Sequence, residues 1–257
     1  MLCPDDCIDL LAMLKRHIAL LLLLFCGVAQ ADDCVVLLHG LARTSASMED
    51  MSAGLQESGY GVVNVSYPSR EHPIETLADM AVSDGLKQCA ELAPGRKIHF
   101  VTHSLGGILV RYYFEDRSVD GIGRVVMLAP PNQGSQAVDA MRDVPGFEWL
   151  NGPAGFQLGK GPESMPLRLG RPRFEFAVVA GNRTIDPITS SFLDDPDDGR
   201  VSVADTRLDG MSDFIVVEVS HAFIMQDEEV MGLVRNFLAT GRFAVEQAHS
   251  VSPGRID

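Results

Sequence analysis

The fold is decided by one short stretch of the sequence, K-I-H-F-V-T-H-S-L-G-G at residues 97–107. Its apolar first half predicts a buried strand over residues 97–102, and residues 105–114 predict the helix that follows at once. The turn between them is a variant of the Gly-x-Ser-x-Gly pattern, with Thr102 in the place of the first glycine. We expect this sharp turn to strain the backbone of Ser104 and to point its hydroxyl up from the sheet.

Ser104 is the predicted nucleophile of an enzyme. At a helix N-terminus, free backbone N–H groups and the helix dipole stabilise an oxyanion that forms beside the serine. Serine is also a frequent N-cap of ordinary helices, which gives a purely structural alternative. The preceding strand, His103 and the paired glycines at 106–107, which let the helix pass close to a neighbouring strand, favour the catalytic interpretation.

Strands and helices alternate along the rest of the chain. Further apolar runs predict strands at 34–39, 61–67, 124–129, 174–180 and 213–219, and periodic segments predict helices at 47–58, 74–92 and 226–239. This alternation implies right-handed crossovers and a mainly parallel central sheet flanked by helices. The predicted fold class is therefore α/β.

Residues 131–172 break the alternation. Glycine, proline and the aromatic residues Phe147, Trp149 and Phe156 are mixed there without a sustained period. Loops of this length are usually functional or disordered, and the aromatic content argues against disorder. Two interpretations stay open, a long packed loop and a lid or cap that supplies an apolar pocket for an acyl chain.

A second motif, H-G-L at residues 39–41, ends the first predicted strand. In a parallel sheet, the loop after an early strand leans over the crevice at the carboxyl ends of the strands. We expect the N–H groups of Leu41 and Leu105 to form an oxyanion hole there. Gly40 would allow the backbone to approach, and His39 would hold the loop.

A serine nucleophile needs a base, and the base needs an acid that fixes its tautomer. His221 follows the strand at 213–219 and precedes the last helix, so it is the predicted base. The acidic run D-D-P-D-D-G-R-V at 194–201 offers the acid. Asp198, which leads into V-S-V at 201–203, fits an acid presented by a turn near a strand.

Asp197 is the alternative acid, and a solvated acidic turn is the interpretation without catalysis. An acidic run also fits calcium binding, but the D-x-D-x-D-G spacing of a calcium loop is absent. We therefore predict no metal at this run.

The N-terminus has the pattern of a secretory signal peptide. Basic residues at 15–17 precede an apolar run at 18–28 and the small-x-small site A-Q-A at 29–31. The run is shorter than the roughly 18–20 residues that span a bilayer, which argues against a membrane anchor. We predict removal of residues 1–31, with translation beginning either at Met1 or at Met13.

Removal of this segment would leave Cys34 and Cys89 as the remaining cysteines of five. Two cysteines in an exported protein predict one disulfide, and two buried free thiols are the alternative. A lipoprotein form anchored through Cys26 is disfavoured, because the bulky Phe25 precedes that cysteine.

The overall composition argues against several classes of protein. The net charge of −14 argues against nucleic-acid binding, which depends on basic patches. The sequence has no C-x-x-C pair, which argues against a zinc ribbon or a redox dithiol. Length and an apolar share of 46% predict one globular domain over 32–243, followed by a flexible polar tail at 244–257.

Four motifs, L-L-H-G-L, T-H-S-L-G-G, P-D-D-G-R-V and S-H-A-F, occur in this order over residues 34–240. In these motifs the chain resembles the α/β-hydrolase superfamily, in particular the small secreted lipases and esterases of bacteria. The resemblance implies a triad of Ser104, Asp198 and His221 and an oxyanion hole from Leu41 and Leu105. It implies hydrolysis of small-molecule or lipid esters without a cofactor and with transient contact to a membrane or lipid surface.

The chain departs from this family pattern at two positions. Thr102 replaces the first glycine of the turn, a position where relatives carry alanine. Calcium-binding lipases carry an aspartate two residues beyond the histidine, where this chain has Phe223, so no such calcium site is expected. Oligomeric state and acyl chain length stay open.

Two other functions fit the same residues. An acyltransferase or lipid-remodelling deacylase on this fold would use the same triad, with an alcohol in place of water in the first case. A non-catalytic envelope binding protein would keep only a decayed pocket, and the apparently complete triad argues against it.

Overall fold

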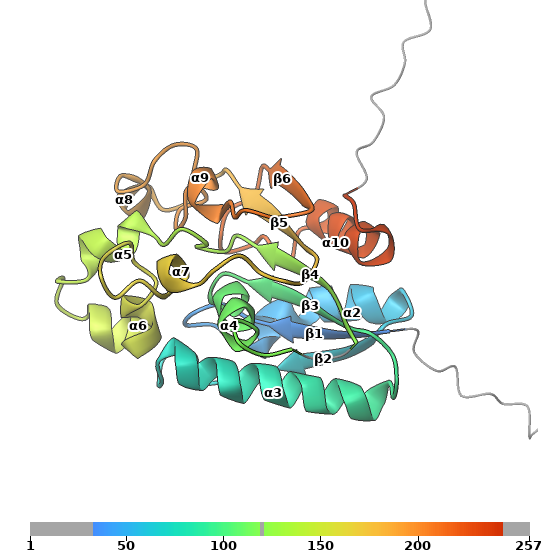
Figure 1. Cartoon of the computed structure of the whole chain (residues 1–257). Helices are drawn as coiled ribbons and strands as arrows, with labels where there is room; N and C mark the ends of the chain where they lie inside the picture. Colours follow the sequence, from blue (N-terminus) through green and yellow to red (C-terminus); the bar gives the residue numbers. More distant parts are fainter. Residues whose placement is uncertain (1–32, 119–120, 244–257) are drawn as a thin grey trace, which may run out of the picture. The chain divides into compact units, whose positions relative to one another are not determined.

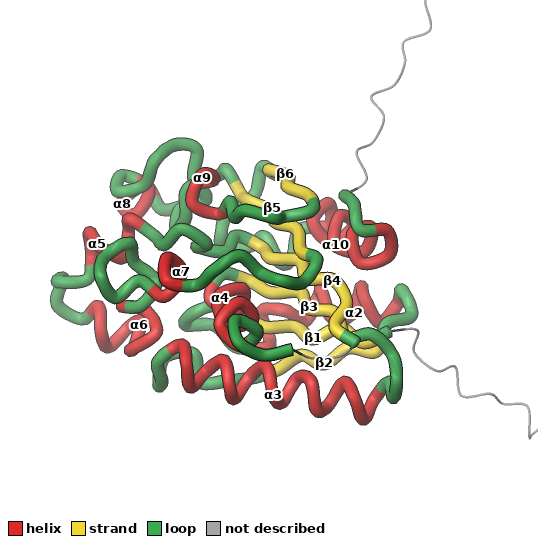
Figure 2. Tube along the Cα trace, viewed as in Figure 1, coloured by secondary structure: helices red, strands yellow, loops and turns green. Residues whose placement is uncertain are grey.

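The computed structural model describes residues 33–118 and 121–243. The predicted signal peptide, the start at Met13 and the tail at 244–257 lie outside the described residues. Six parallel strands form one sheet in the order β2-β1-β3-β4-β5-β6 (Figures 1 and 2). The strands are β1 Cys34–Leu38, β2 Gly61–Val65, β3 Ile98–His103, β4 Ile122–Leu128, β5 Phe176–Gly181 and β6 Asp213–Val217. The predicted α/β class is confirmed.

Helices cover both faces of the sheet (Figure 1). One face packs against α3 and α4, and the other packs against α2 and α10. Their bounds are α2 Glu49–Glu57, preceded by the 3-10 helix η1 Ser45–Met48, α3 Ile74–Leu92, α4 Leu105–Tyr113 and α10 Glu228–Thr240. Because β1 lies between two strands and beneath helices on both sides, all five of its residues are apolar and fully buried.

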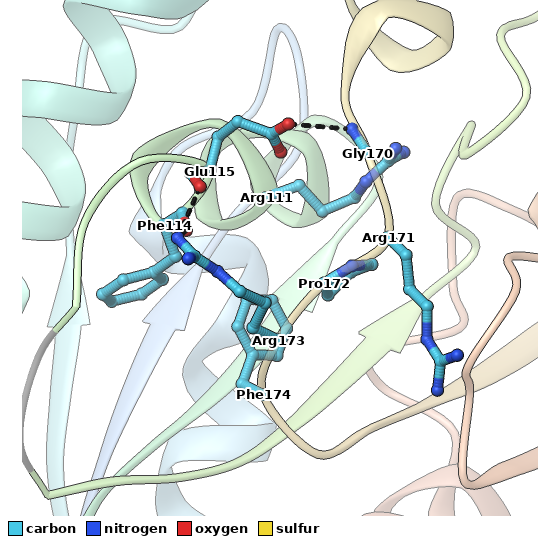
Figure 3. A pocket seen from close by; sticks show the side chains of 8 residues that line it. All are labelled: Arg111, Phe114, Glu115, Gly170, Arg171, Pro172, Arg173 and Phe174. Carbon is cyan, nitrogen blue, oxygen red and sulfur yellow. Dashed lines mark hydrogen bonds between the residues drawn. The ribbon is translucent and has the colours of Figure 1, made fainter.

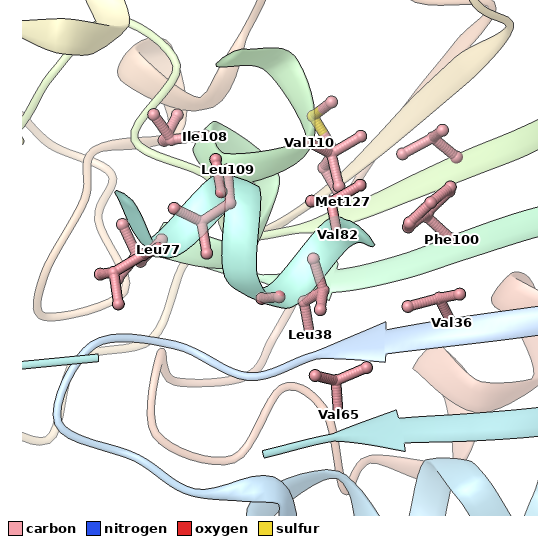
Figure 4. Close-up of a cluster of buried hydrophobic side chains, with 14 of the residues drawn as sticks. Val36, Leu38, Val65, Leu77, Val82, Phe100, Ile108, Leu109, Val110 and Met127 are labelled. Carbon is pink, nitrogen blue, oxygen red and sulfur yellow. The ribbon is translucent and has the colours of Figure 1, made fainter. Parts of the chain in front are cut away.

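The core beneath α3 and α4 brings strand and helix side chains into direct contact (Figure 4). Val36 and Phe100 of the sheet belong to the same buried cluster as Leu77 of α3 and Ile108 of α4. The helix α3 approaches the sheet closely, since a Cβ on Gly85 would lie 2.5 Å from a methyl group of Val36. This close packing fixes α3 against β1.

A disulfide joins Cys34 in β1 to Cys89 in α3, with 5.7 Å between the two Cα atoms. Both cysteines are fully buried. The bond ties the first strand of the described chain to the longest helix of the core.

The segment 131–172 folds into three short helices, α5 Gln136–Met141, α6 Phe147–Phe156 and α7 Met165–Arg168. Glycines and prolines divide these helices into pieces too short for a visible period. Within α6 the helix kinks at Gly152, where φ is +62° and a Cβ would overlap the carbonyl of Arg70. We refer to 131–172 below as the cap segment, because it follows β4 at the edge where the parallel strands end.

Two further short helices, α8 Pro187–Ser190 and α9 Val203–Thr206, lie between β5 and β6. Figure 1 shows α5, α6 and α8 together beyond the carboxyl ends of the strands. No helix in the described ranges has both the length and the apolar character that a bilayer crossing requires.

Candidate active site

Ser104 occupies the turn between β3 and α4 in a strained backbone conformation, with φ of +50° and ψ of −116°. The turn is possible because Gly106 has no side chain, since a Cβ there would lie 2.6 Å from the carbonyl oxygen of Leu38. Ser104 is 7% exposed, whereas the following turn of α4 is buried. The geometry at this turn is the one that the sequence predicts for a serine nucleophile.

Asp198 and His221 lie together at the same edge. The Nδ1 atom of His221 is 2.8 Å from Oδ2 of Asp198, and the side chain of Asp198 is fully buried. The other carboxylate oxygen accepts the backbone N–H groups of Arg200 and Val201, at 2.9 and 2.8 Å. These bonds fix the carboxylate so that it faces the imidazole.

Asp197, the alternative acid, has other partners. Its carboxylate accepts the N–H of Gly199 and the hydroxyl of Ser190, both at 2.7 Å. The structure therefore brings Asp198, and not Asp197, to His221.

The surroundings of Asp198 differ from the prediction in one respect. Residues 201–203 do not form a strand; Ser202 caps α9, with its hydroxyl accepting the N–H of Asp205 at 3.1 Å. The alternation of V-S-V imitates a strand, but a serine before a short helix satisfies a free amide instead. A turn between β5 and β6 presents the acid.

No hydrogen bond joins the Ser104 hydroxyl to His221 in the part of the chain that the structure describes. The contact between nucleophile and base is often long in a free enzyme and shortens when substrate binds. The closeness of the two loops is visible in the neighbouring residue, His103, whose ring centroid lies 4.7 Å from that of His221.

Two stacked aromatic rings, those of His39 and Tyr67, hold the loop at residues 39–41 in place. The rings of His39 and Tyr67 are 4.0 Å apart and nearly parallel, and the Tyr67 hydroxyl donates to the carbonyl of His39. His39 bonds the carbonyl of Gly40 through Nδ1 at 2.9 Å, and burial lowers the pKa of its ring. Within the described ranges, neither the Leu41 nor the Leu105 amide donates a hydrogen bond to the protein. Both donors are available to a ligand.

Sequence reasoning missed two side chains that contact the loop after His221. His103 donates from Nε2 to the carbonyl of His221 at 3.1 Å, and Arg43 donates to the carbonyl of Ala222 at 3.2 Å. Arg43 comes two residues after the H-G-L motif, and His103 directly precedes the serine. Their positions in or next to the two motifs are the signal that the sequence offers for a role at the site. The carbonyls that they bind lie far away in the sequence, so these hydrogen bonds could not be predicted.

Two cavities lie away from this site. One, of about 240 Å³, is enclosed by the end of α4 and residues 170–174, where Glu115 accepts the N–H of Gly170 at 3.1 Å (Figure 3). The other, of about 430 Å³, is lined by basic residues such as Arg117 and Arg124. Neither includes a member of the predicted triad.

The described ranges hold no group of three or more His, Cys, Asp or Glu residues placed to bind a metal ion. Phe223 stands at the position of the calcium-ligating aspartate and is 53% exposed. The absence of a calcium site stays a prediction.

Known proteins of the same fold include several hydrolases. Lipase BlEst2 of Bacillus licheniformis, in mature form, is 20% identical with a TM-score of 0.62, covering 76% of this chain and 87% of the lipase. The metagenomic carboxyl esterase MGS0156 is 19% identical with a TM-score of 0.60, covering 77% of this chain and 67% of the esterase. Phospholipase PlaB from Legionella pneumophila is 16% identical with a TM-score of 0.58, covering 74% of this chain and 53% of the phospholipase.

At such identities these likenesses show the fold alone. No curated protein sequence matches the chain. The family model described as "Alpha/beta hydrolase family" matches residues 35–241, which include the serine turn, the acid loop and His221. The chain belongs to the alpha/beta hydrolase family.

Proposed function

We propose that this protein hydrolyses carboxylic esters through an acyl-enzyme formed on Ser104. His221 takes the hydroxyl proton, the serine oxygen attacks the acyl carbon, and Asp198 stabilises the imidazolium that results. The amides of Leu41 and Leu105 stabilise the oxyanion of the tetrahedral intermediate. His221 then protonates the leaving alcohol, and a water molecule activated by the same imidazole releases the acid.

The observation that carries the proposal is the 2.8 Å hydrogen bond between Asp198 and His221 at the sheet edge that also presents Ser104. The chain order Ser, Asp, His is that of α/β-hydrolases. The strained backbone of Ser104 supports its role, because strain in such turns is concentrated at functional residues.

Exposed apolar side chains support an apolar ester as the substrate. In the described ranges, eight of the eleven exposed large apolar residues lie in the segments that follow β4, β5 and β6: Val144, Trp149, Leu150, Leu167, Ile185, Ile188, Phe192 and Phe223. We refer to these eight residues as the apolar rim. Exposed apolar side chains in these segments fit transient contact with a lipid surface.

Two helices that carry residues of the apolar rim, α6 and α8, have contacts near the proposed triad. The helix α6 contacts the oxyanion loop, since a Cβ on Gly155 would lie 3.5 Å from the side chain of Leu41. Ser190 of α8 donates to Asp197, the neighbour of the predicted acid. We propose that the cap segment contributes to the acyl pocket.

We also propose that the protein works outside the cytoplasm, in the periplasm or medium, after removal of residues 1–31. The Cys34–Cys89 disulfide supports this location, because stable disulfides form mainly in exported proteins.

The test is hydrolysis of p-nitrophenyl esters from acetate to palmitate by the purified mature protein and by Ser104→Ala. We expect the variant to lose on the order of 10⁴–10⁶ in turnover. Ser58→Ala, at an exposed serine at the end of α2, is the matched control and should match the wild type. Undiminished hydrolysis by Ser104→Ala would remove Ser104 from the mechanism.

Two further measurements separate the alternatives. Added alcohol that diverts the acyl group from water into a new ester would favour acyl transfer. A fluorophosphonate probe that fails to label the wild-type protein at Ser104 would favour a binding protein with a decayed pocket.

A further inference from the structure

The imidazole of His103 is enclosed between the proposed nucleophile and the proposed base. It is 1% exposed, directly precedes Ser104, and stacks obliquely on His221 with 4.7 Å between ring centroids. The mechanism above uses neither of its nitrogen atoms. A polar ring buried at this position has a cost that only a specific hydrogen bond offsets.

The hydrogen bonding of His103 determines its tautomer. Its Nε2 atom lies 3.1 Å from the carbonyl oxygen of His221, and a carbonyl can only accept, so Nε2 carries the proton. Its Nδ1 atom is buried without a hydrogen-bond partner in the described part of the chain. That atom faces Gly40, because a Cβ placed there would lie 2.7 Å from it.

Burial, and after it the neighbouring charges, keep the ring neutral. Burial, above all, and then the nearby His221 and Arg43 hold the pKa of His103 well below its ordinary value, and His39 acts in the same direction. Among the described residues, His221, Arg43 and His39 are the titratable groups whose charges act on the ring. A neutral ring at this position adds no positive charge beside an imidazolium formed on His221.

The backbone of His221 is therefore fixed from both sides. Its N–H donates to the carbonyl of Asp198 at 3.0 Å, and its carbonyl accepts from His103. The first bond ties the base to the acid loop, and the second ties it to the turn of the nucleophile. His103 is the side chain that connects the nucleophile turn to the loop of the base.

We propose that His103 is a positioning residue, which holds the backbone of His221 at a fixed distance from Ser104 through its Nε2–H group. The role rests on the proposed ester hydrolysis. It assigns a purpose to the last residue of β3, directly before the serine, that packing alone does not require.

The test compares two amides of different reach. In His103→Gln the amide nitrogen lies near the place of Nε2, and in His103→Asn it lies near the place of Nδ1, where it faces Gly40. We expect the asparagine variant to lose about 10²-fold in kcat, the effect of a misplacement of about 1 Å, with KM nearly unchanged. The glutamine variant should retain most of the wild-type kcat.

Equal kcat values for the two variants, or a loss confined to KM, would overturn the positioning role while leaving the proposed function intact. A wild-type protein that hydrolyses no ester would overturn both. A measurement independent of folding in the variants is the nitrogen-15 NMR spectrum of the wild-type histidines. It should show His103 as the neutral Nε2–H tautomer, and an Nδ1–H tautomer would contradict the proposal.

Discussion

The proposed catalytic centre and the cap segment lie at the same edge of the sheet, but different forces hold them in place. The centre is fixed by backbone geometry: a serine with φ of +50°, glycines that allow close approach, and a carboxylate held by two amides. The cap segment consists of short helices joined by glycines and prolines, and it carries large exposed apolar side chains such as Trp149, which is 81% exposed.

One buried side chain connects the two regions. Arg111 extends from α4, the helix that begins beside Ser104, and donates to oxygen atoms at both ends of the cap segment. The partners at the start of the segment are the carbonyl and the side-chain oxygen of Asn132, each at 3.1 Å, and those at its end are the carbonyls of Pro166 and Leu169, each at 3.0 Å. We therefore expect changes in the proposed catalytic centre to abolish turnover. Loss of the Arg111 hydrogen bonds should lower the stability of the fold, and changes in the apolar rim should alter only the choice of substrate.

The largest effect is expected at the acid. Asp198→Asn keeps the shape of the side chain but no longer fixes the imidazole in the correct tautomer, so kcat should fall about 10⁴-fold. The measurement is kcat with a short, soluble p-nitrophenyl ester. Asp197→Asn is the matched control one residue away and should keep more than about a tenth of the wild-type kcat. A greater loss at residue 197 than at 198 would reverse the assignment of the acid.

The sequence alone predicts the strand, turn and helix around Ser104 well because their signals are local. The strand, the turn and the glycines around Ser104 are consecutive, and β3 and α4 begin and end within one residue of the predicted bounds. The apolar runs locate the six strands for the same reason, and the signal is strongest at β1, which is covered on both faces and apolar throughout.

The cap segment and the links between regions are not predicted, because tertiary contacts create them. At the kink of α6, Gly152 lies so close to the carbonyl of Arg70, in another loop, that no side chain fits there. The acceptors of Arg111 and of His103 are backbone carbonyls, which any residue supplies, so no motif marks them. The structure of residues 201–203 also depends on contacts that the sequence does not show. The residues alternate as in a strand, but Ser202 caps α9.

Loss of the hydrogen bonds between Arg111 and the cap segment should have the next largest effect. Arg111 is 2% exposed, and burial lowers the pKa of its guanidinium to about 10, so it stays charged at neutral pH. Arg111→Met fills similar space but leaves four acceptors without this donor, three of them buried, and we expect the free energy of unfolding to fall by about 3 kcal/mol. Urea denaturation measures this change.

The control for that experiment is Arg168→Met, at an arginine of α7 whose side chain is 54% exposed and whose ion pair with Glu75 is long, at 3.9 Å. Exposed pairs of this kind contribute about 0–1 kcal/mol. If both variants unfold at the same urea concentration, Arg111 does not fasten the cap segment.

The smallest effect is expected at the apolar rim. Trp149→Ala and Ile188→Ala remove the two most exposed apolar side chains, at 81% and 74% exposure. Because only part of each side chain would enter a lipid surface, the rate on an emulsified long-chain ester should fall roughly fivefold. The rate on a soluble short-chain ester should stay at the wild-type value, since the triad is untouched.

Leu92→Ala is the matched control, because Leu92 is 51% exposed but ends α3, outside the segments that carry the apolar rim. It should leave both rates unchanged. Equal losses on emulsified and soluble esters in the rim variants would mean that Trp149 and Ile188 act on the shape of the catalytic centre. The cap segment would then be part of the same rigid unit as the triad, and the contrast between the two regions would be wrong.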